Sequence, residues 1–388
     1  MKQRFSNNKR ACVLAAALLA THGAAHADGG VFQALSPGFY PGVVPGTSDA
    51  FNIYGTVDVF YDHLTSGGQS VNRVLSGGAW TSKFGFFGRE NLGGGTAVSF
   101  VLEAGFNANN GTVGQSGTLF NRQSTVALSN AAWGSLSVGK QFGVGLQLFV
   151  DPFLANGKIS PWAFLSGVAD LGKGASSVES RVNNSAIYTS PTIAGFSTQV
   201  LYALKTDQSE PGPATQNRGI NVTYHPVTGN NSIYVVGGYN QTWCDPTSGD
   251  PSSATCTDST TRTDSYATAL VYDMGRYVFS GSYQLFDPKH DGDYLASVYS
   301  LGSSATIGRN LLRASLVYRH TTQDGNHAIG AALGEDYFLS KRTALYVRAS
   351  LIKNGPNSAQ TIDYTTGSPP PKPGVTVTDL AVGMYHNF

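Results

Sequence analysis

Charged residues and long apolar runs are both scarce in this sequence. Lysine, arginine, aspartate and glutamate make up 13% of the 388 residues, where roughly 25% is usual in soluble domains. After residue 27, no apolar run approaches the roughly 18 residues that indicate a membrane-spanning helix. The formal net charge is only +1, and a nucleic-acid partner would require a basic stripe. These shortages disfavour a helical membrane protein and a nucleic-acid-binding protein.

Catalytic and metal-binding motifs are missing as well. The sequence contains no G-x-S-x-G, no H-E-x-x-H and no phosphate-binding loop. Two of the eight histidines lie before residue 28, and the remaining six show no metal-ligand spacing. We therefore expect no enzyme, no metal site and no cofactor.

Residues 1–27 have the three parts of a secretory signal peptide. Four basic residues precede a ten-residue apolar run, and Ala25-His26-Ala27 supplies a cleavage site. Ten apolar residues cannot span a bilayer as a helix, which needs about 20. The alternative is an amphipathic helix of a cytosolic protein. Cleavage before Asp28 would remove four of the 25 basic groups, leaving 21 against 24 acids and a net charge of −3.

Cysteine is rare, and only two of the three cysteines would remain after cleavage. Cys244 and Cys256 flank a segment rich in proline, glycine and serine. An oxidising export route favours a disulfide between them. Two ligands are too few for a metal site.

What the sequence does contain is two-residue alternation, together with 47 glycines. Phe51, Ile53 and Val57 share one face of a predicted strand, while Asn52 and Asp58 share the other. Similar segments of about ten residues recur as far as the C-terminus. A soluble sandwich also alternates, but its connections are more even in length. Residues 28–49, rich in glycine and proline, precede the first strand and form a predicted leader, and residues 50–388 form the strand domain.

The predicted connections alternate between short turns and long polar loops. Seven short turns, such as Met274–Arg276 and Ser340–Arg342, separate eight longer loops, which include Thr65–Thr81 and Gly143–Ser180. This layout is typical of a transmembrane β-barrel. Seven turns and eight loops join sixteen antiparallel strands, and a barrel of that size encloses a water-filled lumen. The fold class is therefore all-β.

Several segments resemble the general diffusion porins of Gram-negative bacteria. The closest similarity lies in LEAGFNANNGTVGQSGTLFNRQSTVAL (residues 102–128), GSLSVGKQF (134–142), SRVNNSAIYTSP (180–191) and the final VGMYHNF. The resemblance implies an outer-membrane barrel, a homotrimer, and a third loop (143–180) that folds into the lumen. It implies passive diffusion of ions and small hydrophilic solutes, with membrane lipid and lipopolysaccharide as surroundings.

The resemblance also implies a pore constriction. Its basic side would be Lys83, Arg122 and Arg181 on the wall, and its acidic side Asp151 and Asp170 on the third loop. The terminal residue, Phe388, would be the signal that the barrel-assembly machinery reads.

Basic groups outnumber acidic ones among the residues that the alternation places in the lumen. A narrow pore with such an excess concentrates anions, so we expect a weak anion preference, and a nearly unselective pore is the alternative. A substrate-specific channel and an adhesin remain open as well. The residues do not identify the physiological solute. The lumen residues counted are the bases Lys83, Arg122, Arg181, Arg313, Arg319 and Arg348 and the acids Asp58, Asp62, Glu103, Asp151 and Asp170.

Overall fold

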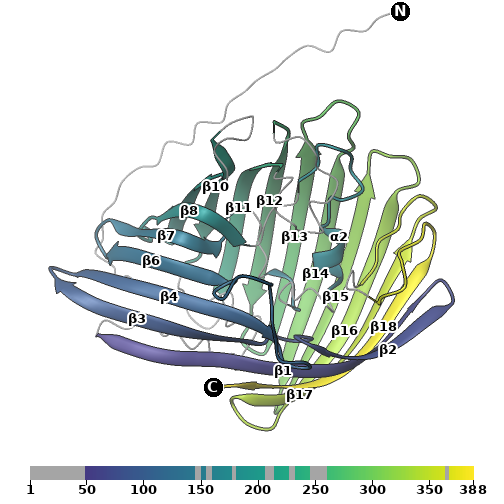
Figure 1. The fold of residues 1–388 in the computed structure, drawn as a ribbon, viewed down its shortest axis with the longest axis horizontal. Coiled ribbons are helices and arrows are strands. Elements are labelled where there is room, and N and C mark those ends of the chain that lie inside the picture. Colours follow the sequence, from purple (N-terminus) through teal and green to yellow (C-terminus); the bar gives the residue numbers. More distant parts are fainter. Residues whose placement is uncertain are drawn as a thin grey trace, which may run out of the picture.

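The structure is a computed structural model, and its fold is a closed antiparallel β-barrel (Figure 1). It describes residues 49–144, 150–153, 160–176, 181–205, 214–226, 232–244, 260–362 and 367–388. The predicted signal peptide and nearly all of the predicted leader, residues 1–48, lie outside the described residues. The sheet closes where the first strand pairs with the last, for example Val59 with Met384.

Sixteen strands form the wall, as the sequence predicts. They are β1 (Ala50–Ser66), β3 (Lys83–Gly93), β4 (Thr96–Asn107), β6 (Gln123–Asn130), β7 (Gly134–Phe142), β8 (Arg181–Thr189), β9 (Phe196–Leu204), β10 (Thr215–Tyr224), β11 (Ser232–Trp243), β12 (Arg262–Asp273), β13 (Tyr277–Pro288), β14 (Ala296–Ile307), β15 (Asn310–Thr321), β16 (His327–Phe338), β17 (Thr343–Asn354) and β18 (Thr376–Asn387). Two further strands are β2 (Gln69–Ser76) and the two-residue β5 (Thr112–Val113). Each wall strand pairs with its neighbours in the chain, apart from the β1–β18 closure.

Strand β2 corrects one sequence prediction, because it lies inside the predicted loop Thr65–Thr81. Gly67 and Gly68 both have positive φ angles, of 57° and 79°, and they form the two-residue turn of a β1–β2 hairpin. β1 therefore pairs on one side first with β3 and then with β2. Between β2 and β3 the chain leaves the sheet over residues 77–82, which we call the inward segment.

The apolar faces of the strands point outward, the reverse of a soluble protein. Phe51 and Ile53 on β1 are 63% and 60% exposed, and Leu301 and Leu333 are similarly exposed. The alternate residues, such as Asp58, are buried inside the barrel. This inversion is what a lipid-facing barrel requires. No helix among the described residues is long and apolar enough to cross a membrane.

A hydrophobic core lies inside the barrel, between the wall and the connection from β7 to β8. That connection, the third loop, contains helix α2 (Pro161–Leu165), which contacts β15, β16 and β17. Trp162 and Leu165 of the helix pack in one cluster with Val317 and Ile352 of the wall. β7 is fifth and β15 thirteenth among the sixteen wall strands, half a circumference apart. The third loop thus reaches from one side of the lumen to the other.

Candidate functional site

Three basic residues gather on the inner side of the β3–β8 wall. Lys83 begins β3, Arg122 directly precedes β6, and Arg181 begins β8. Arg122 and Arg181 both lie near enough to Lys83 for their charges to repel it. The resemblance implied that these three side chains lie together, and the described structure brings them to one region, which we call the basic cluster.

One carboxylate, that of Glu103 on β4, is shared within the basic cluster. Arg122 Nε donates to Glu103 Oε1 at 2.6 Å, and Lys83 Nζ lies 3.5 Å from Oε2. Tyr54 also donates its hydroxyl to Oε2 at 3.1 Å. Among the described residues no carboxylate forms an ion pair with Arg181, whose guanidinium lies 4.3 Å from the centre of the Phe142 ring. The cluster therefore keeps an excess of positive charge.

The third loop contacts the opposite wall through backbone and ring atoms as well as side chains. Arg313 donates to the carbonyl oxygen of Pro152, and the Arg348 guanidinium lies 5.5 Å from the Phe153 ring centre. The wall makes room with inward-facing glycines. A Cβ atom on Gly302 would lie 2.4 Å from Pro152, and one on Gly330 would lie 2.7 Å from Pro161. Such close approach is possible only where the wall residue lacks a side chain.

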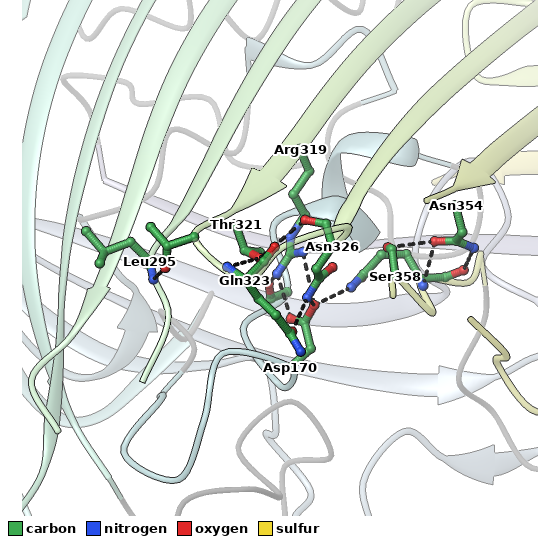
Figure 2. Close-up of polar contacts among 11 residues, drawn as sticks. Asp170, Leu295, Arg319, Thr321, Gln323, Asn326, Asn354 and Ser358 are labelled. Atoms are coloured by element: carbon green, nitrogen blue, oxygen red, sulfur yellow. Dashed lines mark hydrogen bonds and ion pairs between the residues drawn. The ribbon is translucent and has the colours of Figure 1, made fainter. Parts of the chain in front are cut away.

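Asp170 of the third loop lies in a hydrogen-bonded network on the β15 side (Figure 2). Its two oxygens accept from Arg319 at 3.0 and 2.6 Å, and Arg319 is fully buried. Asn326 and Gln360 donate to the same carboxylate at 2.9 and 3.1 Å. These donors come from the wall and from two other loops, so Asp170 ties three connections together.

The two predicted loop acids contact residues outside the basic cluster. Asp151 is buried and accepts a hydrogen bond from Ser160 Oγ at 2.5 Å. Asp170 pairs with Arg319 instead of a cluster residue. A further loop acid, Glu179, lies outside the described residues. The structure thus gathers the predicted basic side and places the two acids in separate contacts.

Asp336 on β16 was not among the sequence candidates, and it organises the wall beneath the third loop. It is fully buried and bonds to both Arg313, at 3.1 Å, and Arg348. We call these three residues the arginine–aspartate cluster. The signal was present in the sequence, because Asp336 follows Gly330, Ala332 and Gly334 on one alternating face. Small residues on that face leave space for arginine side chains and for a loop.

Asp58 was expected to be a lumen charge, but the structure gives it a structural role. Its carboxylate accepts backbone N–H groups from Ala79 at 2.9 Å and Trp80 at 2.6 Å, and the Tyr346 hydroxyl at 2.7 Å. It thereby holds the inward segment against the wall. Asp62, the other β1 acid, is paired with Arg73. Neither carboxylate is available to attract cations in the pore.

Phe388 lies at the seam that closes the barrel. Gly55 N donates to Phe388 O at 3.1 Å, and Phe388 N donates to Gly55 O at 3.0 Å. Gly55 lacks a Cβ atom, which would lie 2.3 Å from the Phe388 ring. The ring remains 46% exposed on the outer face.

Cys244 is disulfide-bonded at the end of β11. The predicted partner, Cys256, lies outside the described residues. Within the described ranges no three histidine, cysteine, aspartate or glutamate side chains are grouped so as to hold a metal ion.

Comparisons with known proteins agree with this architecture. The family model for Gram-negative porins matches residues 14–357. Outer membrane porin protein 32 of Delftia acidovorans is 29% identical over 349 residues, 87% of this chain and 93% of that protein. An outer membrane porin protein of Bordetella pertussis is 33% identical over 154 residues, 39% of this chain and 37% of that protein. The solved structure of the anion-selective porin from Comamonas acidovorans has a TM-score of 0.73 at 26% identity, covering 88% of this chain and 100% of that chain.

Proposed function

This chain belongs to the Gram-negative porin family and is an outer-membrane channel for passive diffusion, and we propose that its constriction lies between the third loop and the basic cluster. Ions and small hydrophilic solutes pass this point without chemical change, so the chain acts as no enzyme. The observation that carries the proposal is the third loop's reach across the lumen to β15–β17, half a circumference from β7. The open path is then left beside Lys83, Arg122 and Arg181.

The constriction selects weakly for anions. The basic cluster has three cations and one carboxylate, and low-dielectric walls focus such a field on passing ions. The solved relative from Comamonas acidovorans is described as anion-selective, which agrees in sign. Asp151 and Asp170 act in this proposal by holding the loop that narrows the path.

Single-channel recording of the purified protein in a planar bilayer tests this function. We expect ohmic single-channel conductance and a reversal potential of anionic sign across a KCl gradient. A cation-selective reversal potential would contradict the role given to the basic cluster. Absence of conductance would contradict the channel itself.

The channel assembles as a homotrimer in this proposal, with short wall strands covered by neighbouring copies. β6 has 8 residues and β7 has 9, whereas every strand from β11 to β18 has 12. A lipid-exposed strand needs about 9–11 residues, so β6 falls short of this length and β7 only reaches its lower limit. Lipid and lipopolysaccharide surround the longer strands. Unheated SDS gels should show an oligomer that dissociates on heating, and a monomer at all temperatures would contradict the trimer.

Phe388 serves assembly in this proposal and takes no part in conduction. Its ring is exposed outside the barrel at the β1–β18 seam, where the barrel-assembly machinery would bind the last strand. Deleting Phe388 should lower the amount of barrel in the outer membrane, whereas Phe388→Tyr, which keeps the ring, should not. Equal assembly rates for the truncated and full chains in a reconstituted assay would refute this role.

In this proposal residues 1–27 are a cleaved signal peptide, and residues 28–49 are a periplasmic leader. Cys244 forms its disulfide with Cys256. Closing a loop of this length contributes roughly 3 kcal/mol in the chain-entropy model. Mass spectrometry of the mature protein without reductant should show a chain beginning near Asp28 and no alkylated cysteine. Two alkylated thiols per chain would disprove the pairing.

A further inference from the structure

A depression of about 480 Å³ lies on the outer surface of the barrel over β13–β17. Small outward-facing residues form its floor, among them Ser303 and Ala314, which are register partners on β14 and β15. Phe279 and Leu333 stand beside them in the same row and form the sides. Since the outer surface faces membrane lipid, this depression is a groove in a lipid-facing wall.

Glu335 lines the same groove and is out of place on a lipid-facing surface. It alternates with Leu333 and Tyr337, which are 65% and 41% exposed on the outer face. Its register partners are the apolar Leu312 and Val347. Among the described residues its carboxylate has no hydrogen-bond or ion-pair partner. A charged group on the lipid face is costly, so the carboxylate points to a cation supplied from outside the chain.

The short turn between β14 and β15 contains a cation, Arg309, which does not pair with Glu335. Arg309 is exposed in the short turn between β14 and β15, and its carbonyl oxygen accepts from Phe338 N at 2.9 Å. Phe338 is three residues beyond Glu335, about 10 Å along an extended strand. The described structure contains no ion pair of Arg309. Arg309 does not line the groove, and it leaves the Glu335 carboxylate without a counter-ion.

We propose that this groove binds a phospholipid whose zwitterionic head group carries an ammonium. The Glu335 carboxylate accepts from the ammonium, which is attached on the water side of the phosphate. One acyl chain lies over Ser303 and Ala314. The short turns of such barrels face the periplasm, so the lipid comes from the inner leaflet. The inference rests on the outer-membrane placement and is independent of the pore.

Native mass spectrometry of the full-length protein from detergent, with defined added lipids, tests this site. Phosphatidylethanolamine should bind more tightly than phosphatidylglycerol, which has a phosphate and no ammonium. Glu335→Gln should weaken phosphatidylethanolamine about tenfold, the loss of one charge-assisted hydrogen bond. Ala314→Leu should weaken both lipids by filling the floor of the groove.

Glu90→Gln is the matched control, because Glu90 is an exposed acid near a short turn, on β3, away from the groove. It should leave lipid binding unchanged. Equal binding by Glu335→Gln and the unmodified protein, equal loss in Glu90→Gln, or equal affinity for the two lipids would overturn the site. Dissociation of the oligomer by Glu335→Gln would overturn it in favour of a second copy of the chain. All variants should conduct normally; loss of conductance by the unmodified protein would contradict the channel and leave the lipid result standing.

Discussion

On the β3–β8 side of the lumen Lys83 and Arg122 share the carboxylate of Glu103 and Arg181 adds a third cation. Beneath the third loop Arg313 and Arg348 share the buried Asp336, and Arg319 pairs with Asp170. Lys83 and Arg122 of the basic cluster have side chains that are 16% and 12% exposed. Arg313 and Arg348 of the arginine–aspartate cluster are 4% and 3% exposed. The two sides use the same residue types in different surroundings.

The difference shows that charges lining a lumen do not contribute equally to its field. Arg313 and Arg348 neutralise one buried aspartate and hold the wall and third loop together. Arg319 forms a one-to-one ion pair with Asp170. The basic cluster has three cations for one acid, the arginine–aspartate cluster has two for one, and the side chains of Lys83 and Arg122 are closer to water. We therefore expect ion selectivity to depend on the basic cluster and stability to depend on the arginine–aspartate cluster.

The largest expected effect comes from removing the charge of Asp336. Asp336→Asn would leave two buried guanidinium groups without a counter-ion, which costs about 3–5 kcal/mol. The urea midpoint of unfolding of the refolded barrel should fall clearly. Glu103→Gln, the equivalent change in the basic cluster, should cost much less because its cations reach water. Equal loss of stability in both variants would break the comparison.

A smaller effect is expected when the third loop loses its ion pair to the wall. Asp170→Asn weakens charge-assisted hydrogen bonds from Arg319, Asn326 and Gln360, a loss of roughly 1.5–3 kcal/mol. The loop should then move within the pore and add current fluctuations in single-channel records. Asp324→Asn, a change at an exposed residue of a neighbouring loop, is the control. Quiet records from Asp170→Asn would show that packing alone holds the loop.

The smallest expected change in free energy concerns ion selectivity, and it tests the electrostatic role of the basic cluster. Glu103→Gln should strengthen the anion preference and Arg122→Gln should weaken it. A unit charge about 10 Å from an ion in water is worth about 0.4 kcal/mol, or roughly a twofold change in permeability. Reversal potentials across a KCl gradient measure both. Arg276→Gln, at an exposed short turn, should have little effect, and shifts of the same sign in the two lumen variants would be inconsistent with the field described.

The barrel could be predicted from the sequence because alternation and turn length are local properties. Each strand shows its own period, and the sixteen-strand prediction is confirmed. The hairpin at Gly67–Gly68 was missed because β2 is polar, although two adjacent glycines are a signal for a tight turn. Its outward residues include Asn72 as well as Val74, so its alternation of apolar and polar residues is weak.

The pairing of charges could not be predicted, because it depends on how the third loop folds across the lumen. Asp170 and Arg319 are 149 residues apart and meet only through that path. The alternation of β1 predicts that Asp58 is a free acid in the lumen. In the structure its carboxylate instead accepts hydrogen bonds from backbone N–H groups of the inward segment. The alternation of a strand predicts which side of the wall a residue faces, but it does not predict which other segment packs against that residue.

The inward glycines under the third loop have a consequence for engineering. Gly302 and Gly330 lie where Pro152 and Pro161 approach the wall, and a methyl group on either glycine would collide with the loop. The shape of the third loop and the small size of these wall residues therefore depend on each other, although the two segments are far apart in the chain. A third loop transplanted from another barrel would need its own pattern of small wall residues. Redesign of pore width in this protein has to change loop and wall together.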